Sequence, residues 1–154
     1  MSYSFALEDG EANYPELEKL YRAHYAEMRE RLSKDGVDIP DYNPRLSLYF
    51  NANKQGYLLN IVARTDEGEA VGYCNVYITN DMHNGDLIAR EDTLYVTPEH
   101  RNGVGRRMVQ WGLQELKGRG CKRLLVQPAT DLRVGAIWQR MGFKPVAMVM
   151  AYTF

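Results

Sequence analysis

The sequence lacks long hydrophobic runs, has few cysteines and carries almost no net charge. No apolar stretch approaches the roughly 20 residues that cross a bilayer, and the start of the chain has neither the basic region nor the apolar core of a secretory signal. Two cysteines, Cys74 and Cys121, indicate neither a disulfide framework nor a zinc site. A formal net charge of −1 offers no global basic field for nucleic acid. We therefore expect a reduced, cytoplasmic protein with no metal, no membrane partner and no nucleic-acid partner.

What the sequence does have is the size and hydrophobic content of one globular domain. Its 154 residues are 45% hydrophobic and 25% charged, which are ordinary values for a chain that buries a core. We expect residues 1–154 to form a single α/β domain.

Hydrophobic patterns divide the chain into elements. Strands are predicted at residues 3–7, 57–64, 70–79, 87–96, 122–127 and 146–153. Helices are predicted at residues 14–33, 45–54, 104–116 and 131–141. Short loops make the three central neighbours antiparallel, whereas the helix after residue 96 makes the next pair of strands parallel. The prediction is a mixed, mostly antiparallel twisted sheet with helices on both faces.

Residues 94–108 have the pattern of a strand, a tight turn and a helix. Gly103 and Gly105 leave backbone N–H groups uncovered, so an anion can approach the main chain. The helix directs its positive dipole end at the same place, and Arg101, Arg106 and Arg107 add charge that suits phosphate. The pattern indicates a pyrophosphate-binding turn, but it is neither a Walker loop nor a full dinucleotide fingerprint. A plain turn before a surface helix would use the same residue types.

Two blocks of sequence resemble one known family. Residues 94–108 read Leu-Tyr-Val-Thr-Pro-Glu-His-Arg-Asn-Gly-Val-Gly-Arg-Arg-Met and are similar to the acetyl-CoA-binding signature of the GNAT superfamily of acyl-CoA N-acyltransferases. Residues 131–143 read Asp-Leu-Arg-Val-Gly-Ala-Ile-Trp-Gln-Arg-Met-Gly-Phe and resemble the closing segment of that family. The resemblance covers about residues 57–154 well and the N-terminal third in outline.

The resemblance implies a splayed central strand pair whose cleft holds acetyl-CoA, the expected cosubstrate. The main chain at the end of the strand would contact the pantetheine arm, and the turn would hold the pyrophosphate. The expected acetyl-CoA contacts are Leu94, Tyr95, Val96, Arg101, Asn102, Gly103, Val104, Gly105, Arg106, Asp131 and Trp138.

Attack of an amine on a thioester needs a base, because an ammonium has no free lone pair. Strand alternation predicts that Asp92 shares one face with Leu94 and Val96. It places Glu91 on the opposite face. The family often carries an acidic residue on the face of Asp92, so Asp92 is the candidate catalytic base and Glu91 the reserve. The alternative is a structural carboxylate that pairs with Arg90 or a lysine.

The three histidines are weaker candidates. His24 falls within the apolar stripe of the first long helix and is expected to pack in the core. His83 has the side-chain chemistry of a base near neutral pH, but it lies in a loop and is expected to be exposed. His100 lies in the turn and is expected to contact phosphate or solvent.

Two positions depart from the family pattern. Arg101 precedes the first glycine of the turn too closely to take the family's first cradle position, unless His100 takes it. Trp138 stands where many members have a tyrosine that protonates the leaving thiolate. An indole only donates and cannot serve as a general acid. Either Tyr95 or Tyr152 supplies the proton, or the thiolate leaves unaided.

The leading hypothesis is an acetyl-CoA-dependent N-acetyltransferase that modifies a primary amine by direct attack in a ternary complex. No cysteine lies near the turn, so no acyl-enzyme is expected. The acceptor would be a small molecule or a protein amine. Residues 35–44, which contain three aspartates and an aromatic side chain, either line its entrance or form a solvated connection. The alternative is a CoA-binding regulatory or assembly module without strong catalysis, and either protein would act as a monomer or a homodimer.

Overall fold

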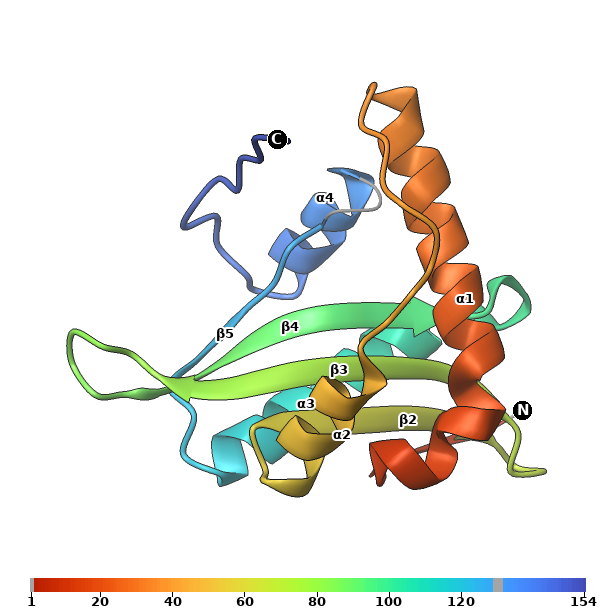
Figure 1. Cartoon of the computed structure of the whole chain (residues 1–154). Coiled ribbons are helices and arrows are strands. Elements are labelled where there is room, and N and C mark those ends of the chain that lie inside the picture. The colour runs from red at the N-terminus through yellow and green to blue at the C-terminus, as the bar shows by residue number, and fades with distance from the viewer. Residues whose placement is uncertain (1, 129–131) are drawn as a thin grey trace.

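The fold is a five-stranded sheet with helices on both of its faces (Figure 1). The structure is a computed structural model that describes residues 2–128 and 132–154. The strands are β1 (Tyr3–Leu7), β2 (Leu58–Thr65), β3 (Ala70–Asn80), β4 (Leu87–Val96) and β5 (Arg123–Leu125), and they follow this order across the sheet. Pairing is antiparallel from β1 to β4 and parallel between β4 and β5, which confirms the predicted mixed sheet.

Helices α1 (Gly10–Lys34) and α2 (Leu46–Lys54) lie on one face of the sheet, and α3 (Val104–Gly118) lies on the other (Figure 1). A short 3-10 helix, η1 (Pro98–His100), precedes α3, and α4 (Leu132–Arg140) follows β5. Helix α1 begins at Gly10 rather than at residue 14, because the Asp9 carboxylate accepts a hydrogen bond from the Ala12 N–H at 3.0 Å. Within the described parts of the chain, no helix is long and apolar enough to span a membrane.

Each face of the sheet buries its own hydrophobic cluster. On the α1 side, Leu17 and Tyr73 are fully buried. On the α3 side, Met108 and Ile61 are buried in the same way. Gly112 lets α3 approach the sheet closely, because a Cβ atom there would lie 3.1 Å from the Ile61 Cδ1 atom. Complete burial of one such large side chain contributes about 1.5–3 kcal/mol, so both clusters hold β2 and β3 firmly in place.

A β-bulge in β4 corrects the predicted alternation of the carboxylates. Thr93 pairs with Asn75 and Glu91 pairs with Val76, so Asp92 is an extra residue without a partner on β3. After the bulge, Leu94 packs in the α3-side cluster, and Glu91 also lies on that side beside Val76. Asp92 instead accepts a hydrogen bond from α2 on the opposite face. The prediction that Asp92 shares a face with Leu94 was therefore wrong.

The end of the chain also differs from the prediction. Strand β5 pairs with β4 over only three residues, and the expected strand at residues 146–153 does not form. This segment is exposed throughout, and its apolar side chains Val146, Met148 and Met150 face solvent. A strand requires a neighbouring backbone that supplies hydrogen-bond partners. None of the described strands supplies such partners to this segment.

Candidate active site

A large cavity lies on the α1 and α2 side of the sheet and reaches β4 at the point where β4 and β5 diverge. Its volume is about 680 Å³, and its wall includes residues 91–96 of β4. The last pair between the two strands is Arg90 with Leu125. Beyond that pair, Gln127 and Pro128 line the cavity. This divergence is the splay that the family resemblance implies, and β5 is the outermost strand of the described sheet on that side.

The start of α3 is built to receive an anion. Gly103 is the N-cap residue with φ of +101°, a conformation that favours glycine, and no side chain caps the helix. Among the described residues, no acceptor is found for the backbone N–H groups of residues 102–106. These groups and the helix dipole together create a positive site. The predicted turn therefore has the geometry of a phosphate-binding site.

The arginine predicted to hold the pyrophosphate makes other contacts in this structure. The Arg101 Nε donates to the Val96 carbonyl oxygen at 2.8 Å, and its NH2 group donates to both Glu27 oxygens at 2.7 and 2.9 Å. Its guanidinium also lies 5.3 Å from the centre of the Tyr95 ring. The carbonyl of Val96 is one of the predicted main-chain contacts of acetyl-CoA. Arg101 therefore lies in the cavity between α1 and β4.

Other basic residues of the turn point in different directions. His100 Nδ1 lies 2.9 Å from the Tyr3 hydroxyl, and the two rings meet edge to face, so His100 packs against β1 instead of the cavity. The Arg107 guanidinium lies 5.5 Å from the centre of the Phe5 ring. Arg106 is exposed at the first turn of α3, where its charge reinforces the positive end of the helix.

Two adjacent carboxyl groups line the cavity, and burial raises the pKa of both. For Glu91, burial raises the pKa to about 7, although a hydrogen bond from the Gln127 N–H at 3.2 Å opposes this change. The Asp92 carboxyl opens onto the cavity, where surrounding protein raises its pKa and the Tyr49 hydroxyl, which donates at 3.0 Å, opposes the rise. No ion pair of either group is found among the described residues, so neither makes the predicted pair with Arg90. Such unpaired carboxyl groups with raised pKa values are suited to proton transfer.

Tyrosines form the wall that faces these carboxyl groups. The Tyr14 hydroxyl lies 3.0 Å from that of Tyr42, so the loop after α1 is tied to the cavity. The Tyr21 ring lies 4.2 Å from that of Tyr73, and the hydroxyl of Tyr49 reaches β4 as described. Sequence reasoning considered only Tyr42, within the possible acceptor entrance at residues 35–44, and identified none of Tyr14, Tyr21, Tyr49 and Tyr73 as functional. The only signal of the wall was the unusual content of 11 tyrosines.

Two histidines occupy the environments expected for them. His24 stacks on Tyr95 at 5.3 Å, and its Nδ1 lies 2.9 Å from the Tyr73 hydroxyl. Burial lowers the pKa of His24, so the neutral ring is favoured. His24 also lines the cavity. His83 is exposed in the turn between β3 and β4, and it does not line the cavity.

Trp138 presents a buried donor at the cavity. The residue is 6% exposed, and its Nε1–H has no hydrogen-bond partner within the described residues. It lines the cavity together with Val134, and its ring packs against Phe143. Asp131, the other contact predicted from this block, lies outside the described residues. Tyr152 is exposed and does not line the cavity, whereas Tyr95 does.

The described structure thus combines an open mixed sheet whose parallel pair diverges, a bulged strand that carries two carboxyl groups and a helix start whose geometry suits an anion. The sequence matches the model of the acetyltransferase (GNAT) family over residues 16–143. The chain therefore belongs to the GNAT acetyltransferase family. Among proteins with curated functions, no sequence matches this chain significantly.

Solved structures share the fold at low sequence identity. A ribosomal-protein-alanine N-acetyltransferase from Brucella melitensis biovar Abortus 2308 is 15% identical with a TM-score of 0.73, over 98% of this chain and 99% of that one. An aminoglycoside acetyltransferase from an uncultured soil metagenomic sample is 15% identical with a TM-score of 0.73, over 99% and 95% of the two chains. Glucosamine-6-phosphate N-acetyltransferase from Arabidopsis thaliana is 10% identical with a TM-score of 0.68, over 100% and 99%.

Proposed function

We propose that residues 1–154 form one N-acetyltransferase domain that transfers an acetyl group from acetyl-CoA to a primary amine by direct attack in a ternary complex. The observation that carries this proposal is the single cavity that joins the two unpaired carboxyl groups to the diverging strands. Its wall includes Val96 and Arg101, which lead directly to the anion-receiving start of α3.

The residues present fit acetyl-CoA as the donor. The backbone N–H groups at residues 102–106 suit its pyrophosphate. The edge of β4 at Leu94 and Tyr95, which has no partner on β5, suits the amides of its pantetheine arm, and Val96 would join it once Arg101 leaves the Val96 carbonyl. The unpartnered N–H of Trp138 gives one more donor at the cavity wall. When bound, acetyl-CoA supplies an activated acetyl group as a thioester.

Asp92 is the proposed base. The bulge directs it to the face of the sheet that carries the tyrosine wall, and the hydroxyl of Tyr49 holds its carboxyl in place. A carboxylate there can accept a proton from a bound ammonium, directly or through water, once the cavity has removed the ammonium from bulk solvent. Glu91 lies at the divergence of the strands and is the reserve. Trp138 can stabilise a thiolate by hydrogen bonding, but it cannot protonate it.

The acceptor is proposed to be cationic before it reacts. Arg101 already pairs with Glu27, and burial favours neutral His24, so the cavity offers little free positive charge. Tyrosine rings attract ammonium groups through cation–π contacts, and Asp92 adds negative charge. The names of similar structures, which include acetyltransferases for aminoglycosides and for a ribosomal-protein alanine, agree with an amine acceptor.

Calorimetric titration with acetyl-CoA tests the donor site. The variant Gly103→Ala places a side chain at φ of +101° and should weaken binding about tenfold through distortion of the turn, because such backbone strain costs about 1–2 kcal/mol. Gly68→Ala is the matched control, since Gly68 has φ of +86° in the β2–β3 turn, far from the cavity. Absence of acetyl-CoA binding at millimolar concentration would refute the proposal.

Turnover with a panel of primary amines tests the chemistry. Asp92→Asn should retain acetyl-CoA binding and lower kcat by about 10²–10⁴-fold, the usual contribution of a general base. A second candidate function, a CoA-binding regulatory module, is favoured by Trp138, whose indole cannot protonate the leaving thiolate. Tight binding of acetyl-CoA with no turnover of any amine would support that function and contradict an enzyme.

A further inference from the structure

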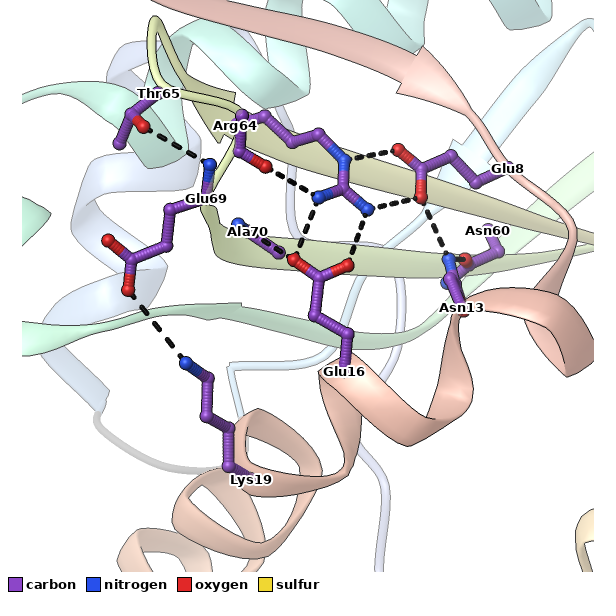
Figure 2. A network of polar contacts seen from close by, with 10 residues as sticks. Glu8, Asn13, Glu16, Lys19, Asn60, Arg64, Thr65, Glu69 and Ala70 are labelled. Atoms are coloured by element: carbon purple, nitrogen blue, oxygen red, sulfur yellow. Dashed lines mark hydrogen bonds and ion pairs between the residues drawn. The ribbon is translucent and has the colours of Figure 1, made fainter.

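A network of hydrogen bonds runs over β2 and β3 on the face of the sheet that α1 covers, and it ends at Tyr21 in the wall of the cavity. It begins at Arg64, which donates to the two oxygens of Glu8 at 2.8 and 2.9 Å (Figure 2). The same guanidinium also pairs with Glu16. Asn13 Nδ2 then donates to Glu8 Oε1 at 3.1 Å and to Asn60 Oδ1 at 2.7 Å. This first half of the hydrogen-bond network lies between α1 and β2 (Figure 2).

The second half of the hydrogen-bond network consists of two buried side-chain amides. Asn60 and Asn75 are 2% and 1% exposed and face each other on β2 and β3. Asn60 Nδ2 donates to Asn75 Oδ1 at 2.7 Å, and Asn75 Nδ2 donates to the Tyr21 hydroxyl oxygen at 3.0 Å. Asn60 Nδ2 also approaches this oxygen at 3.4 Å. The Tyr21 oxygen therefore accepts hydrogen bonds from the interior of the protein.

The charges of Arg64 and Glu8, at the end of the network far from Tyr21, determine which group donates and which accepts in every hydrogen bond. Arg64 can only donate and an ionised Glu8 can only accept. Hydrogen bonding from Arg64 lowers the pKa of Glu8, so the carboxylate is the stable form. The Asn13 amide must therefore turn its nitrogen toward Glu8, and the same nitrogen donates to Asn60. Each following amide is oriented in turn, so Tyr21 receives a donor and keeps its own proton for another partner.

The hydroxyl proton of Tyr21 is available to a partner in the cavity. Both interior contacts of the hydroxyl oxygen are donors, and no acceptor for its O–H is found among the described residues. Tyr21 lines the cavity, as does Asp92. Burial raises the pKa of Tyr21, so the hydroxyl stays protonated. The protein thus presents a donor of fixed direction on the same side of the sheet as the proposed base.

We propose that Tyr21 determines acceptor specificity by donating a hydrogen bond to an oxygen atom of the amine substrate. This inference rests on the proposed function. An ammonium has no acceptor site, and the lone pair of the neutral amine must remain free to attack. The nitrogen is therefore a poor partner for Tyr21, whereas a carbonyl or hydroxyl oxygen near it is a good one. The preferred acceptors are primary amines with such an oxygen on a neighbouring carbon, and plain alkylamines are disfavoured.

The test compares glycinamide, which has a carbonyl beside the amine, with propylamine, which has none. For Tyr21→Phe, kcat/KM with glycinamide should fall about tenfold relative to the unaltered protein, the typical loss for one hydrogen bond. With propylamine it should change less than about twofold. Tyr25→Phe is the control from the same helix, because the Tyr25 hydroxyl donates to the Pro40 carbonyl oxygen at 2.7 Å. Tyr25→Phe should change kcat/KM by the same factor for glycinamide and for propylamine.

A second variant separates specificity from stability. Asn13→Ala interrupts the hydrogen-bond network at a residue that does not itself line the cavity, so the interior amides lose their fixed orientation while Tyr21 stays intact. It should reduce the preference for glycinamide over propylamine, with a smaller effect than Tyr21→Phe. Equal losses on both acceptors in Tyr21→Phe, or an unchanged preference in Asn13→Ala, would overturn the inference and leave the acetyltransferase proposal standing. Failure of the unaltered protein to acetylate any primary amine of the panel, these two included, would overturn both.

Discussion

Replacement of Glu91 by glutamine should make the stability of the protein less sensitive to pH. The Glu91 side chain lies in the wall of the cavity beside the Gln127 N–H, which donates to its carboxyl at 3.2 Å. Glutamine has nearly the same shape and retains an oxygen that can accept this bond. The substitution therefore removes the titration of the group with little change in packing.

The sign and size of the effect follow from the pKa of Glu91. Burial raises this pKa from 4.5 to about 7 in the folded protein. As the pH rises from 4.5 to 7, the unfolded chain releases this proton first, so unfolding becomes easier. Each tenfold difference in proton affinity corresponds to about 1.4 kcal/mol. Glu91 should therefore cost about 3 kcal/mol of stability above pH 7, and nothing at pH values well below 4.5.

Urea unfolding near the two ends of this range measures the difference. The free energy of unfolding of Glu91→Gln is compared with that of the unaltered protein at each pH. The difference should be small at about pH 4 and should favour Glu91→Gln by about 3 kcal/mol at about pH 8. Glu99→Gln is a suitable control, because Glu99 is exposed in η1 and does not line the cavity. If Glu91→Gln changes the stability by the same amount at both pH values, the reasoning about its burial is refuted.

Three further outcomes are expected. Gly72→Ala would place a Cβ atom 2.8 Å from the Tyr95 carbonyl oxygen, and this overpacking should cost about 1–3 kcal/mol of stability. Calorimetry should show a fall in Tm of about 2–4 °C for each kcal/mol lost. An unchanged Tm would contradict the close approach of β3 and β4. Glu27→Gln releases Arg101 from a half-exposed ion pair and should tighten acetyl-CoA binding by up to about fivefold in a titration, whereas weaker binding would mean that Glu27 positions Arg101 for the donor. Asp9→Ala removes the cap of α1 and should lower the free energy of unfolding by about 1 kcal/mol in urea, and no loss would show that the cap contributes nothing.

Much of the fold can be predicted from the sequence, because its signals are local. The alternating apolar residues of β3 and β4 and the short turn between them determine an antiparallel pair. The glycines at positions 103 and 105 mark the turn before α3, since few other residues adopt φ of +101° at the first of them. These patterns depend on neighbours in the chain, so the sequence alone contains them.

The bulge and the C-terminal segment could not be predicted in this way. An extra residue at Asp92 leaves the apolar alternation of Leu94 and Val96 intact on its far side, so the sequence does not show where the register changes. The segment at residues 146–153 has an apolar pattern that suits a strand, but a strand also requires a neighbouring strand, and none pairs with this segment in the described sheet. Both errors arise from contacts between strands rather than from local preference.

The tyrosine wall was missed for a related reason. Tyr14, Tyr21, Tyr49 and Tyr73 come from two helices and a strand, and only the packing of α1 and α2 on β3 brings them together. In the sequence each one reads as a single apolar position of its own element. The chemistry of the wall is a property of the group, because one ring attracts an ammonium weakly and several rings around a carboxylate attract it more strongly.

The bulge in β4 determines which face of the sheet each of the carboxyl groups of Glu91 and Asp92 occupies. In a regular strand, two consecutive residues point to opposite faces, and Asp92 would have shared the apolar α3 side with Leu94 and Val96. The inserted residue leaves Glu91 on that side, where burial raises its pKa to about 7, and turns Asp92 to the tyrosine wall, where Tyr49 donates to it. The inserted residue thus decides which carboxyl group lies on the apolar side and which one lies at the tyrosine wall. Asp92 is then the group that can meet an amine held by the tyrosines, while Glu91 faces the gap between β4 and β5. This division of positions favours Asp92 as the base on geometry, although burial raises the pKa of Glu91 to about 7.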